Sequence, residues 1–297
     1  MSDAQSRGSR GVVPPHDDGA GGSRGVVPPH HHTEPVTTRR VVRLRDGARE
    51  LEDSLVVEEP LEIRLDGTPL AVVMRTPGAD ADLCLGFVLT EGIVTKPDAI
   101  DSIVDLGEGR WDLRTVDGVT IDPAQFQRNF YSTSSCGVCG KASIDAIRVT
   151  GAKPPSGPLV DAGVILSLPG RLIEHQAAFQ ETGGLHAAAA FDGSGEILAV
   201  REDVGRHNAV DKLVGHLAAR SWPLPPLGLM VSGRISFEIT QKAAVAGISL
   251  VCGVSAASSL AVDLAEEFGM SVVGFLRDGG FTLYAGGERI RGIDTPG

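Results

Sequence analysis

The most constraining feature of this chain is the regular alternation of strand-like and helix-like segments along its second half. Apolar runs with strand character alternate there with amphipathic segments, and the links between them are short. Strands are expected at 187–191, 197–200, 227–232, 249–254, 271–276 and 281–285, and helices at 167–180, 206–219, 236–246 and 258–268. Such alternation is typical of a layered α/β domain.

The first half of the chain has a different pattern, rich in strands. Alternating segments at 41–44 and 54–57 precede a hairpin signal, in which Asp66-Gly67 separates strands at 61–65 and 69–75. A helix is expected over 80–91, with Cys84 as a small core residue, followed by strands at 101–106 and 110–116. We therefore expect a β-rich N-terminal subdomain over 39–131 and an α/β domain over 132–297, with a cysteine segment near their junction.

Residues 1–38 are expected to form a disordered tail. The segment Gly-Ser-Arg-Gly-Val-Val-Pro-Pro-His occurs at 8–16 and again at 22–30. Segments so rich in Gly, Pro and Ser cannot bury a core. Two copies of nine residues are also too few and too short to stack as a solenoid.

Composition excludes several classes of function. The 297 residues carry a net charge of −11, which argues against a general nucleic-acid or anionic-membrane binder. The sequence contains neither an apolar run of spanning length nor a basic-then-apolar export signal. Its four cysteines are too few for a disulfide framework in a chain of this length. A cytoplasmic protein is the expectation.

The segment Cys136-Gly137-Val138-Cys139-Gly140 is the strongest chemical signal. A helical pattern follows it at once, and a thiol at a helix start faces unpaired N–H groups that favour the thiolate. Structural zinc is disfavoured because a second cysteine pair is missing, and the His-x-Glu element of a zinc deaminase is missing too. Disulfide exchange and persulfide transport both remain open.

Polar turns follow several of the expected strands and indicate a ligand site at one edge of the sheet. Arg201–Lys212 is rich in polar residues and includes His207, and Asn208 or Asp203 is expected to cap the following helix. Ser232-Gly233-Arg234 could hold a phosphate through backbone N–H groups and a guanidinium. Similar turns follow at 254–259 and 274–280, and His186 is a further candidate. A phosphorylated ligand is the expectation.

Taken together, these segments resemble the formate dehydrogenase accessory sulfur-carrier family, FdhD. The similarity extends from about Pro60 to Tyr284. The motifs that carry it are Glu59–Ile63, Met74–Gly78, Leu85–Gly92, Cys136–Gly140, Thr182–His186, Arg201–Lys212, Ser232–Arg234 and Gly274–Arg277. The sequence departs from the common family pattern at two positions, with Ala257 in place of proline and Gly280 in place of a basic residue.

The resemblance implies a fold and an activity. The fold would be a three-layer α/β sandwich similar to cytidine deaminase, without the zinc chemistry. A cysteine desulfurase would load sulfur onto Cys136 as a persulfide, with Cys139 as assistant. The sulfur would pass to a molybdenum bis(molybdopterin guanine dinucleotide) cofactor, a transient ligand, before this cofactor enters formate dehydrogenase.

The resemblance also implies a cofactor-binding loop, which comprises Phe275, Leu276, Arg277, Asp278, Gly279 and Gly280. Ser232, Gly233, Arg234 and His207 would contribute to the same cofactor site. A homodimer would suit a cofactor with two guanine arms. The alternative is a thiol redox protein or a cofactor-binding chaperone without sulfur transfer.

Overall fold

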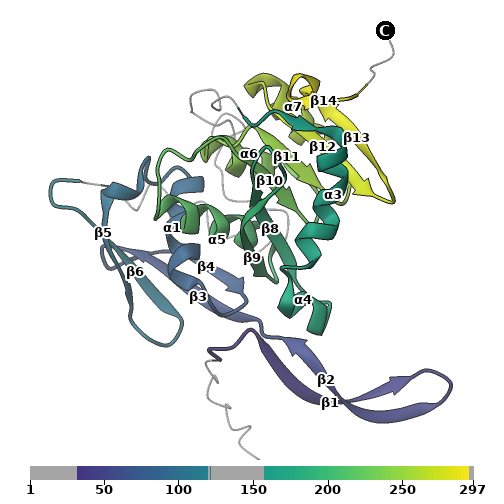
Figure 1. The fold of residues 1–297 in the computed structure, drawn as a ribbon. Coiled ribbons are helices and arrows are strands. Elements are labelled where there is room, and N and C mark those ends of the chain that lie inside the picture. Colours follow the sequence, from purple (N-terminus) through teal and green to yellow (C-terminus); the bar gives the residue numbers. More distant parts are fainter. Residues whose placement is uncertain (1–31, 120, 122–156, 294–297) are drawn as a thin grey trace, which may run out of the picture. The chain divides into compact units, whose positions relative to one another are not determined.

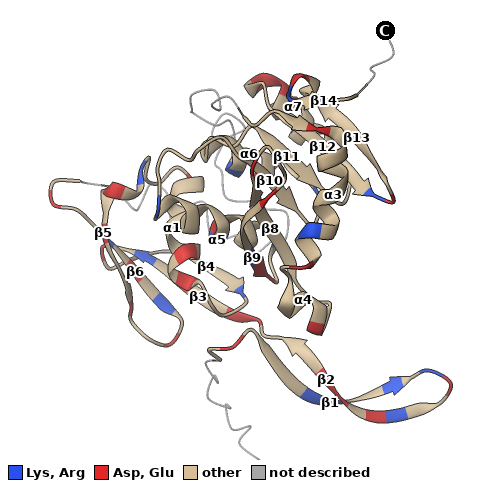
Figure 2. Cartoon of the chain, in the orientation of Figure 1, with Lys and Arg blue, Asp and Glu red and all other residues tan. Residues whose placement is uncertain are grey.

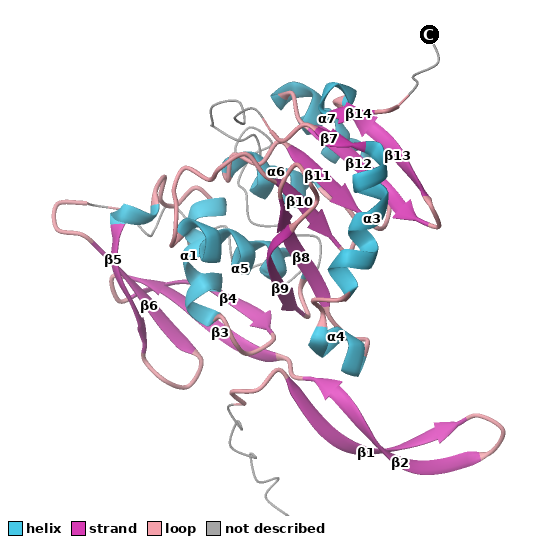
Figure 3. Cartoon of the chain, viewed as in Figure 1, coloured by secondary structure: helices cyan, strands magenta, loops and turns pink. Residues whose placement is uncertain are grey.

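The computed structural model describes residues 32–119, 121 and 157–293, and two sheets dominate it (Figure 1). One sheet has four strands in the order β4-β3-β6-β5, and the other has six in the order β13-β12-β11-β10-β8-β9. Helices alternate with the strands along the chain (Figure 3). The expected mixed α/β class is thereby confirmed, whereas the likeness to cytidine deaminase stays a prediction.

The first four strands form two hairpins, as the alternation predicts. They are β1 (Val36–Leu44), β2 (Ala48–Val56), β3 (Glu59–Leu65) and β4 (Thr68–Arg75). β1 therefore begins within the last residues of the segment expected as a tail. Asp66 and Gly67, which connect β3 to β4, both have positive φ. Two such residues in a row match a turn whose twist suits a tight hairpin.

The four-stranded sheet packs on one helix. This helix is α1 (Asp80–Thr90), and the sheet is completed, after the short 3-10 helix η1 (Pro97–Ala99), by β5 (Ile100–Asp105) and β6 (Arg110–Thr115). Leu61, Ile63 and Leu65 alternate along β3 and are fully buried in the same cluster as the apolar residues of α1. Cys84 of α1 lies in this cluster and is a core residue, as expected.

The six-stranded sheet is assembled from the alternating segments of the second half. Its strands are β8 (His186–Phe191), β9 (Ile197–Asp203), β10 (Gly228–Val231), β11 (Leu250–Gly253), β12 (Ser271–Arg277) and β13 (Gly280–Ala285). The helices between them are α5 (Arg206–Ala218), α6 (Phe237–Val245) and α7 (Ser259–Phe268). β10, β11 and β12 are parallel, whereas β8, β9 and β13 run antiparallel to their neighbours.

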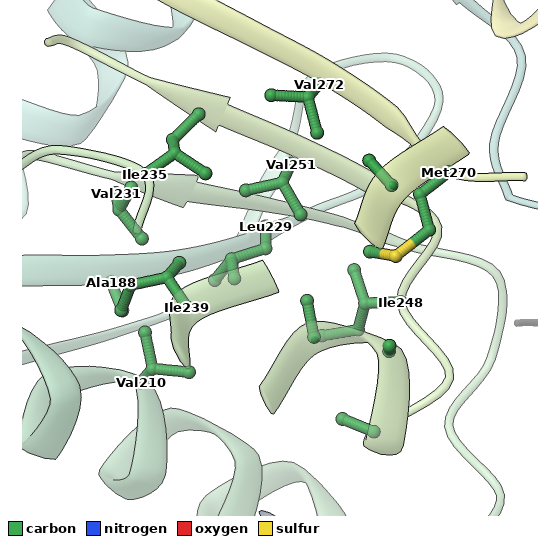
Figure 4. Packing of buried hydrophobic residues seen from close by; sticks show 14 of the residues in the cluster. Ala188, Val210, Leu229, Val231, Ile235, Ile239, Ile248, Val251, Met270 and Val272 are labelled. Carbon is green, nitrogen blue, oxygen red and sulfur yellow. The ribbon is translucent and has the colours of Figure 1, made fainter. Parts of the chain in front are cut away.

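The two faces of this sheet carry separate cores because successive side chains of a strand point to opposite sides. Leu229 and Val231 of β10 pack with the buried residues of α5, α6 and α7 (Figure 4). Met230, between them, packs on the opposite face with Ile165 and Leu168 of α3 (Ala162–Ile173). The sheet is therefore the middle layer of three.

The expected helix over 167–180 is instead two helices, α3 and α4 (Ala177–Thr182). Ile165, Leu168 and Leu172 are buried at helical spacing, so the apolar face of α3 begins earlier than expected. The chain leaves helical geometry at the buried Gln176, whose φ is −105° and ψ is 64°. α4 ends at Gly183 in the left-handed region, the usual end of a helix.

A few short elements have no counterpart in the expected set. β7 (Val160–Asp161) and β14 (Ile290–Arg291) form a two-residue parallel pair, and η3 (Gly287–Arg289) is a single 3-10 turn. Elements of two or three residues are too short to show periodicity in sequence. Within the described residues, no helix combines the length and the apolar character needed to cross a bilayer.

Two glycines let α1 and α5 pack with their backbones in contact. A methyl group at Gly86 would lie 1.8 Å from the carbonyl oxygen of Asp211, and one at Gly215 would lie 1.9 Å from that of Asp82. Only glycine fits either position without a shift of the helices. This contact joins the helix of the four-stranded sheet to a helix of the six-stranded sheet.

Candidate functional site

All strands of the six-stranded sheet have one end at the same edge, called here the carboxyl edge. The parallel strands β10, β11 and β12 all end there. β8 begins there and β9 ends there, because both lie antiparallel to their neighbours and His186 pairs with Asp203. The structure therefore brings together the polar turns that the sequence places after successive strands, at the kind of edge where α/β sheets bind ligands.

The backbone of the turns at this edge is fixed by hydrogen bonds beyond the strands themselves. Ile235 N–H donates to the carbonyl of Ala256 at 3.0 Å, and Ser258 N–H donates to the carbonyl of Ile235 at 3.0 Å. Phe275 N–H donates to the carbonyl of Ser255, also at 3.0 Å. The turns after β10, β11 and β12 thus form one connected surface.

The Ser232-Gly233-Arg234 turn lies against the first residue of β8. Ser232 donates its N–H to the Ala187 carbonyl at 3.0 Å, and its Oγ accepts the Ala187 N–H at 2.9 Å. A methyl group at Gly233 would lie 3.3 Å from Nδ1 of His186, so glycine permits this close approach. Arg234 is exposed. Ser232 therefore orders the turn while Arg234 faces solvent.

His207 lies in the first turn of α5 and faces the residues that follow this turn. Its Nε2 is 3.4 Å from Oγ of Ser236 and 3.9 Å from Oε2 of Glu238. Burial, together with the nearby positive charges of Arg206 and Lys242, lowers the pKa of His207 to about 3. The imidazole is therefore neutral near pH 7 and can donate or accept a hydrogen bond.

His186, the first residue of β8, lies close to Gly233. Burial lowers its pKa, and the positive charge of Arg206 acts in the same direction. His186 and the Arg206 side chain therefore lie beside Gly233, and the neutral His207 lies at Ser236 and Glu238, just beyond the turn. The guanidinium groups of Arg206 and Arg234 would favour an anionic ligand at this turn.

The expected cofactor-binding loop, Phe275–Gly280, is the end of the β12–β13 hairpin. Phe275 is exposed with a φ of 49°, an uncommon backbone region for a bulky residue, and the Arg277 guanidinium lies 5.5 Å from the centre of its ring. Asp278, Gly279 and Gly280 are exposed. Leu276 is 1% exposed and packs in the core, so its side chain does not face a ligand.

A buried network behind the edge was not predicted from the sequence. It centres on Asp203, which is fully buried and accepts hydrogen bonds from the Thr76 and Gly205 N–H groups. Asn208 Nδ2 lies 3.0 Å from Oδ1 of Asp203, and Lys212 Nζ lies 2.7 Å from its Oδ2. The network ties the end of β4 to the end of β9 and to α5.

The N-cap of α5 differs from the expected one because Asp203 and Asn208 belong to this buried network. The N-cap of α5 is Gly205, with no side-chain cap hydrogen bond, rather than Asp203 or Asn208. Asn208 donates to the Met74 carbonyl at 2.7 Å and to Asp203 instead. Both side chains are used in contacts with distant segments, which sequence-local capping rules do not include.

A second buried network joins α1, α5 and α6. Nζ of Lys242 lies 2.9 Å from a carboxylate oxygen of Asp211, 2.8 Å from one of Glu91 and 2.9 Å from Oγ1 of Thr90. Burial alone would lower the pKa of Lys242, but Asp211 and Glu91 outweigh it and raise the pKa. Thr90 also donates to Asp211 at 2.7 Å. The contact between α1 and α5 is thus stabilised by polar interactions as well as by close packing of the two backbones.

The two expected sulfur-chemistry residues, Cys136 and Cys139, lie outside the described residues. Cys84 and Cys252 are both fully buried, and burial raises the pKa of each thiol. A protonated, buried thiol is a poor nucleophile. Neither of these two cysteines therefore competes for the role expected of Cys136. Across the part of the chain that the structure describes, no group of three His, Cys, Asp or Glu residues could hold a metal ion.

Comparison with known proteins extends this description. A family model described as the FdhD/NarQ family matches residues 56–291. The chain belongs to this family. The match confirms the resemblance drawn from the ordered motifs, and it spans both sheets and the carboxyl edge.

Individual relatives of this FdhD/NarQ family member agree with the match. The protein named "Sulfur carrier protein FdhD" of Streptomyces avermitilis is 50% identical over 268 residues, covering 85% of this chain and 94% of that relative. A protein of the same name from Mycobacterium tuberculosis is 46% identical over 253 residues, covering 80% and 92%. The crystal structure of a putative formate dehydrogenase accessory protein from Desulfotalea psychrophila superposes with a TM-score of 0.69 at 21% identity, covering 86% of this chain and 99% of that one. That structure shares the fold.

Proposed function

We propose that this FdhD/NarQ family member is a cytoplasmic sulfur carrier that takes persulfide sulfur from a cysteine desulfurase and delivers it to the molybdenum cofactor of formate dehydrogenase. The observation that carries the proposal is the identity of up to 50%, over most of both chains, with relatives named sulfur carrier protein. The Cys136-Gly137-Val138-Cys139 segment supplies thiols with the required chemistry.

The transfer to Cys136 is an exchange between two sulfur atoms. The Cys136 thiolate attacks the terminal sulfur of the desulfurase persulfide, a new S–S bond forms at Cys136, and the desulfurase thiolate leaves. In release, the Cys139 thiolate attacks the Cys136 sulfur, which gives a Cys136–Cys139 disulfide and frees the terminal sulfur as sulfide. Both thiols are oxidised as the sulfane sulfur is reduced, so the electrons balance.

The molybdenum bis(molybdopterin guanine dinucleotide) cofactor is the acceptor, a substrate for this protein. The carboxyl edge supports its binding, because the Arg206 side chain and His186 lie beside Gly233 and the exposed Arg234 follows it. Ser232, Gly233, Arg234 and His207 would contact phosphates there. Phe275 and Arg277 offer an exposed aromatic ring and a cation for a guanine base, with Asp278, Gly279 and Gly280 at the hairpin end.

Persulfide mass spectrometry tests the sulfur step. The protein is incubated with cysteine and a cysteine desulfurase, alkylated under native conditions and digested, and formate dehydrogenase activation is measured in parallel. We expect a sulfur adduct on Cys136 that the Cys136→Ala variant loses together with activation. Cys84 and Cys252 are internal controls, since their buried thiols should stay unlabelled until the protein unfolds.

The same measurement tests the alternative, a thiol redox protein or cofactor-binding chaperone, which the Cys-x-x-Cys spacing permits. Because release through Cys139 also ends in a Cys136–Cys139 disulfide, the discriminating variant is Cys139→Ala. No persulfide on Cys136 of this variant after loading would support the alternative. A Cys136→Ala variant that still carries sulfur and still activates the dehydrogenase would refute the carrier role of Cys136.

Nucleotide titration tests the ligand step independently of sulfur. GDP serves as the probe, and calorimetry compares Arg234→Gln with Arg114→Gln, whose exposed arginine lies on β6. Weaker GDP binding in Arg234→Gln alone is expected. Equal binding in both variants would remove Arg234 from the site. Light scattering with and without GDP would show whether a homodimer accompanies binding, as the two guanine arms suggest.

A further inference from the structure

The β1–β2 hairpin, called here the ribbon, is a two-stranded sheet of its own. Among the described strands, β1 and β2 pair only with each other. The ribbon contacts the rest of the chain at its base, where Oγ of Ser54 donates to Glu181 of α4 at 2.8 Å and Val56 lies against Gly184, at which a methyl group would be 3.1 Å from Cγ1 of Val56. The family match begins at residue 56, where β2 ends, so the proposed sulfur chemistry gives this ribbon no role.

The end of the ribbon that carries its turn is mostly exposed to solvent. Val42 is 66% exposed and Leu44 is 82% exposed, and both belong to β1. A two-stranded ribbon without a packed face is only marginally stable in water. The backbone groups along the outer side of β1 can pair with a further strand. The ribbon therefore gains stability if an additional strand joins it.

The two strands carry opposite charge. Arg39, Arg40 and Arg43 are the charged residues of β1, whereas β2 carries Glu50, Glu52 and Asp53 beside a single arginine (Figure 2). Cross-strand pairing sets Arg40 opposite Glu52, Arg39 opposite Asp53 and Arg43 opposite Arg49, and Arg43 also forms an ion pair with Asp53 at 3.2 Å. The positive charge of β1 is thus partly balanced from the β2 side, whereas no described strand lies along its outer side.

This charge pattern disfavours a second copy of the chain as the added strand. Two-fold pairing of β1 with β1 would set arginines against arginines, and pairing of β2 with β2 would set carboxylates against carboxylates. Like charges opposite each other destabilise a strand pair. Pairing of β1 with β2 of the next copy is head-to-tail and would form an open chain of molecules.

We propose that the outer edge of β1 binds an extended acidic segment of a partner protein by strand addition. Main-chain hydrogen bonds to β1 would supply most of the affinity, and Arg39, Arg40 and Arg43 would select acidic side chains on the added strand. Val42 and Leu44 would cover apolar residues at alternate positions of that segment. The ribbon then forms a three-stranded sheet, which stabilises it.

Fluorescence anisotropy with labelled nine-residue peptides tests this inference on the full chain. The probes are a peptide of alternating Glu and Val, the matching Lys and Val peptide, and the Glu/Val peptide with its central residue replaced by proline. We expect the acidic peptide to bind and the basic peptide not to bind. Introducing proline removes a strand N–H and should lower the affinity of the acidic peptide by at least about 10-fold. Equal binding of the proline peptide would refute strand addition.

Charge reversal tests the assignment to β1. In the Arg39→Glu/Arg40→Glu/Arg43→Glu variant, the affinity for the acidic peptide should fall by about 10-fold or more. The control, Arg110→Glu/Arg114→Glu/Arg291→Glu, changes three other exposed arginines by the same total charge and should bind as the unmodified chain does. Equal loss in both variants would overturn the proposal. So would self-association of the unmodified chain that charge reversal on β1 abolishes, because a second copy would then be the occupant.

Discussion

Replacing Gly86 with alanine would place a methyl group inside the contact between α1 and α5. The new carbon would lie 1.8 Å from the Asp211 carbonyl oxygen, whereas ordinary contact begins at 3.4 Å, so the backbones must move apart by about 1.6 Å (3.4 minus 1.8). Overpacking of this kind costs roughly 1–3 kcal/mol. The same movement stretches the Thr90–Asp211 and Lys242–Glu91 hydrogen bonds, each of which contributes about 1 kcal/mol.

The helix itself gains from the substitution, because alanine is favoured over glycine in a helix by about 1 kcal/mol. Combining these effects, we expect Gly86→Ala to lower the free energy of unfolding by about 3 kcal/mol. Urea denaturation followed by circular dichroism measures this quantity.

Gly170 in α3 is a matched control. A methyl group there meets no atom within 4 Å, so Gly170→Ala should stabilise the protein by about 0.5–1 kcal/mol. The Gly86→Ala/Gly215→Ala double variant should cost less than the sum of its singles, since one separation of the helices relieves both clashes. If Gly86→Ala proves as stable as Gly170→Ala, the close packing of α1 on α5 is refuted.

Two further predictions concern buried polar groups. Lys242→Met should destabilise the protein by about 3–5 kcal/mol, because it leaves the Asp211 carboxylate buried without its cation. The matched change in the exposed Arg43–Asp53 pair, Arg43→Met, should lower the free energy of unfolding by less than about 1 kcal/mol. Equal shifts of the urea denaturation midpoint in the two variants would contradict this account. His207 has a pKa lowered by burial to about 3 in the folded state, so the unfolded chain binds its proton more tightly. The neutral ring therefore makes its full contribution to the free energy of unfolding above about pH 6.5. Below this pH the contribution falls by on the order of 1 kcal/mol per pH unit. His207→Gln should flatten the stability profile between pH 6.5 and 4.5, and an unchanged slope would show that His207 does not cause it.

The sequence predicts most of the fold because the signals for strands and helices are local. Leu61, Ile63 and Leu65 alternate within one strand, and a single segment is enough to show their common face. The polar turns after the strands predict the carboxyl edge in the same way, since parallel strands must end together. The break at Gln176 could not be predicted in this way, because the residues around it, Glu174-His175-Gln176-Ala177, include no glycine or proline to mark the end of a helix.

The buried networks could not be predicted, because their members are far apart in the chain. Thr76 and Asp203 are separated by 127 positions, and Lys212 reaches the Thr76 carbonyl across 136. Lys212 belongs to a polar run that suggests a solvated face, yet it is 1% exposed. Pairing of this kind depends on how the two sheets are joined, which no single segment shows. The same applies to Leu276, a member of an expected binding loop that packs in the core.

The full set of partners around Asp203 bears on how variants of this residue should be interpreted. An ionised carboxylate has about four acceptor positions, and Thr76, Gly205, Asn208 and Lys212 supply four donors. No lone pair is left to take a proton from a substrate or to hold a cation. An inactive Asp203→Ala protein would therefore report the loss of the framework beneath the carboxyl edge, although its phenotype would look like that of a missing catalytic acid.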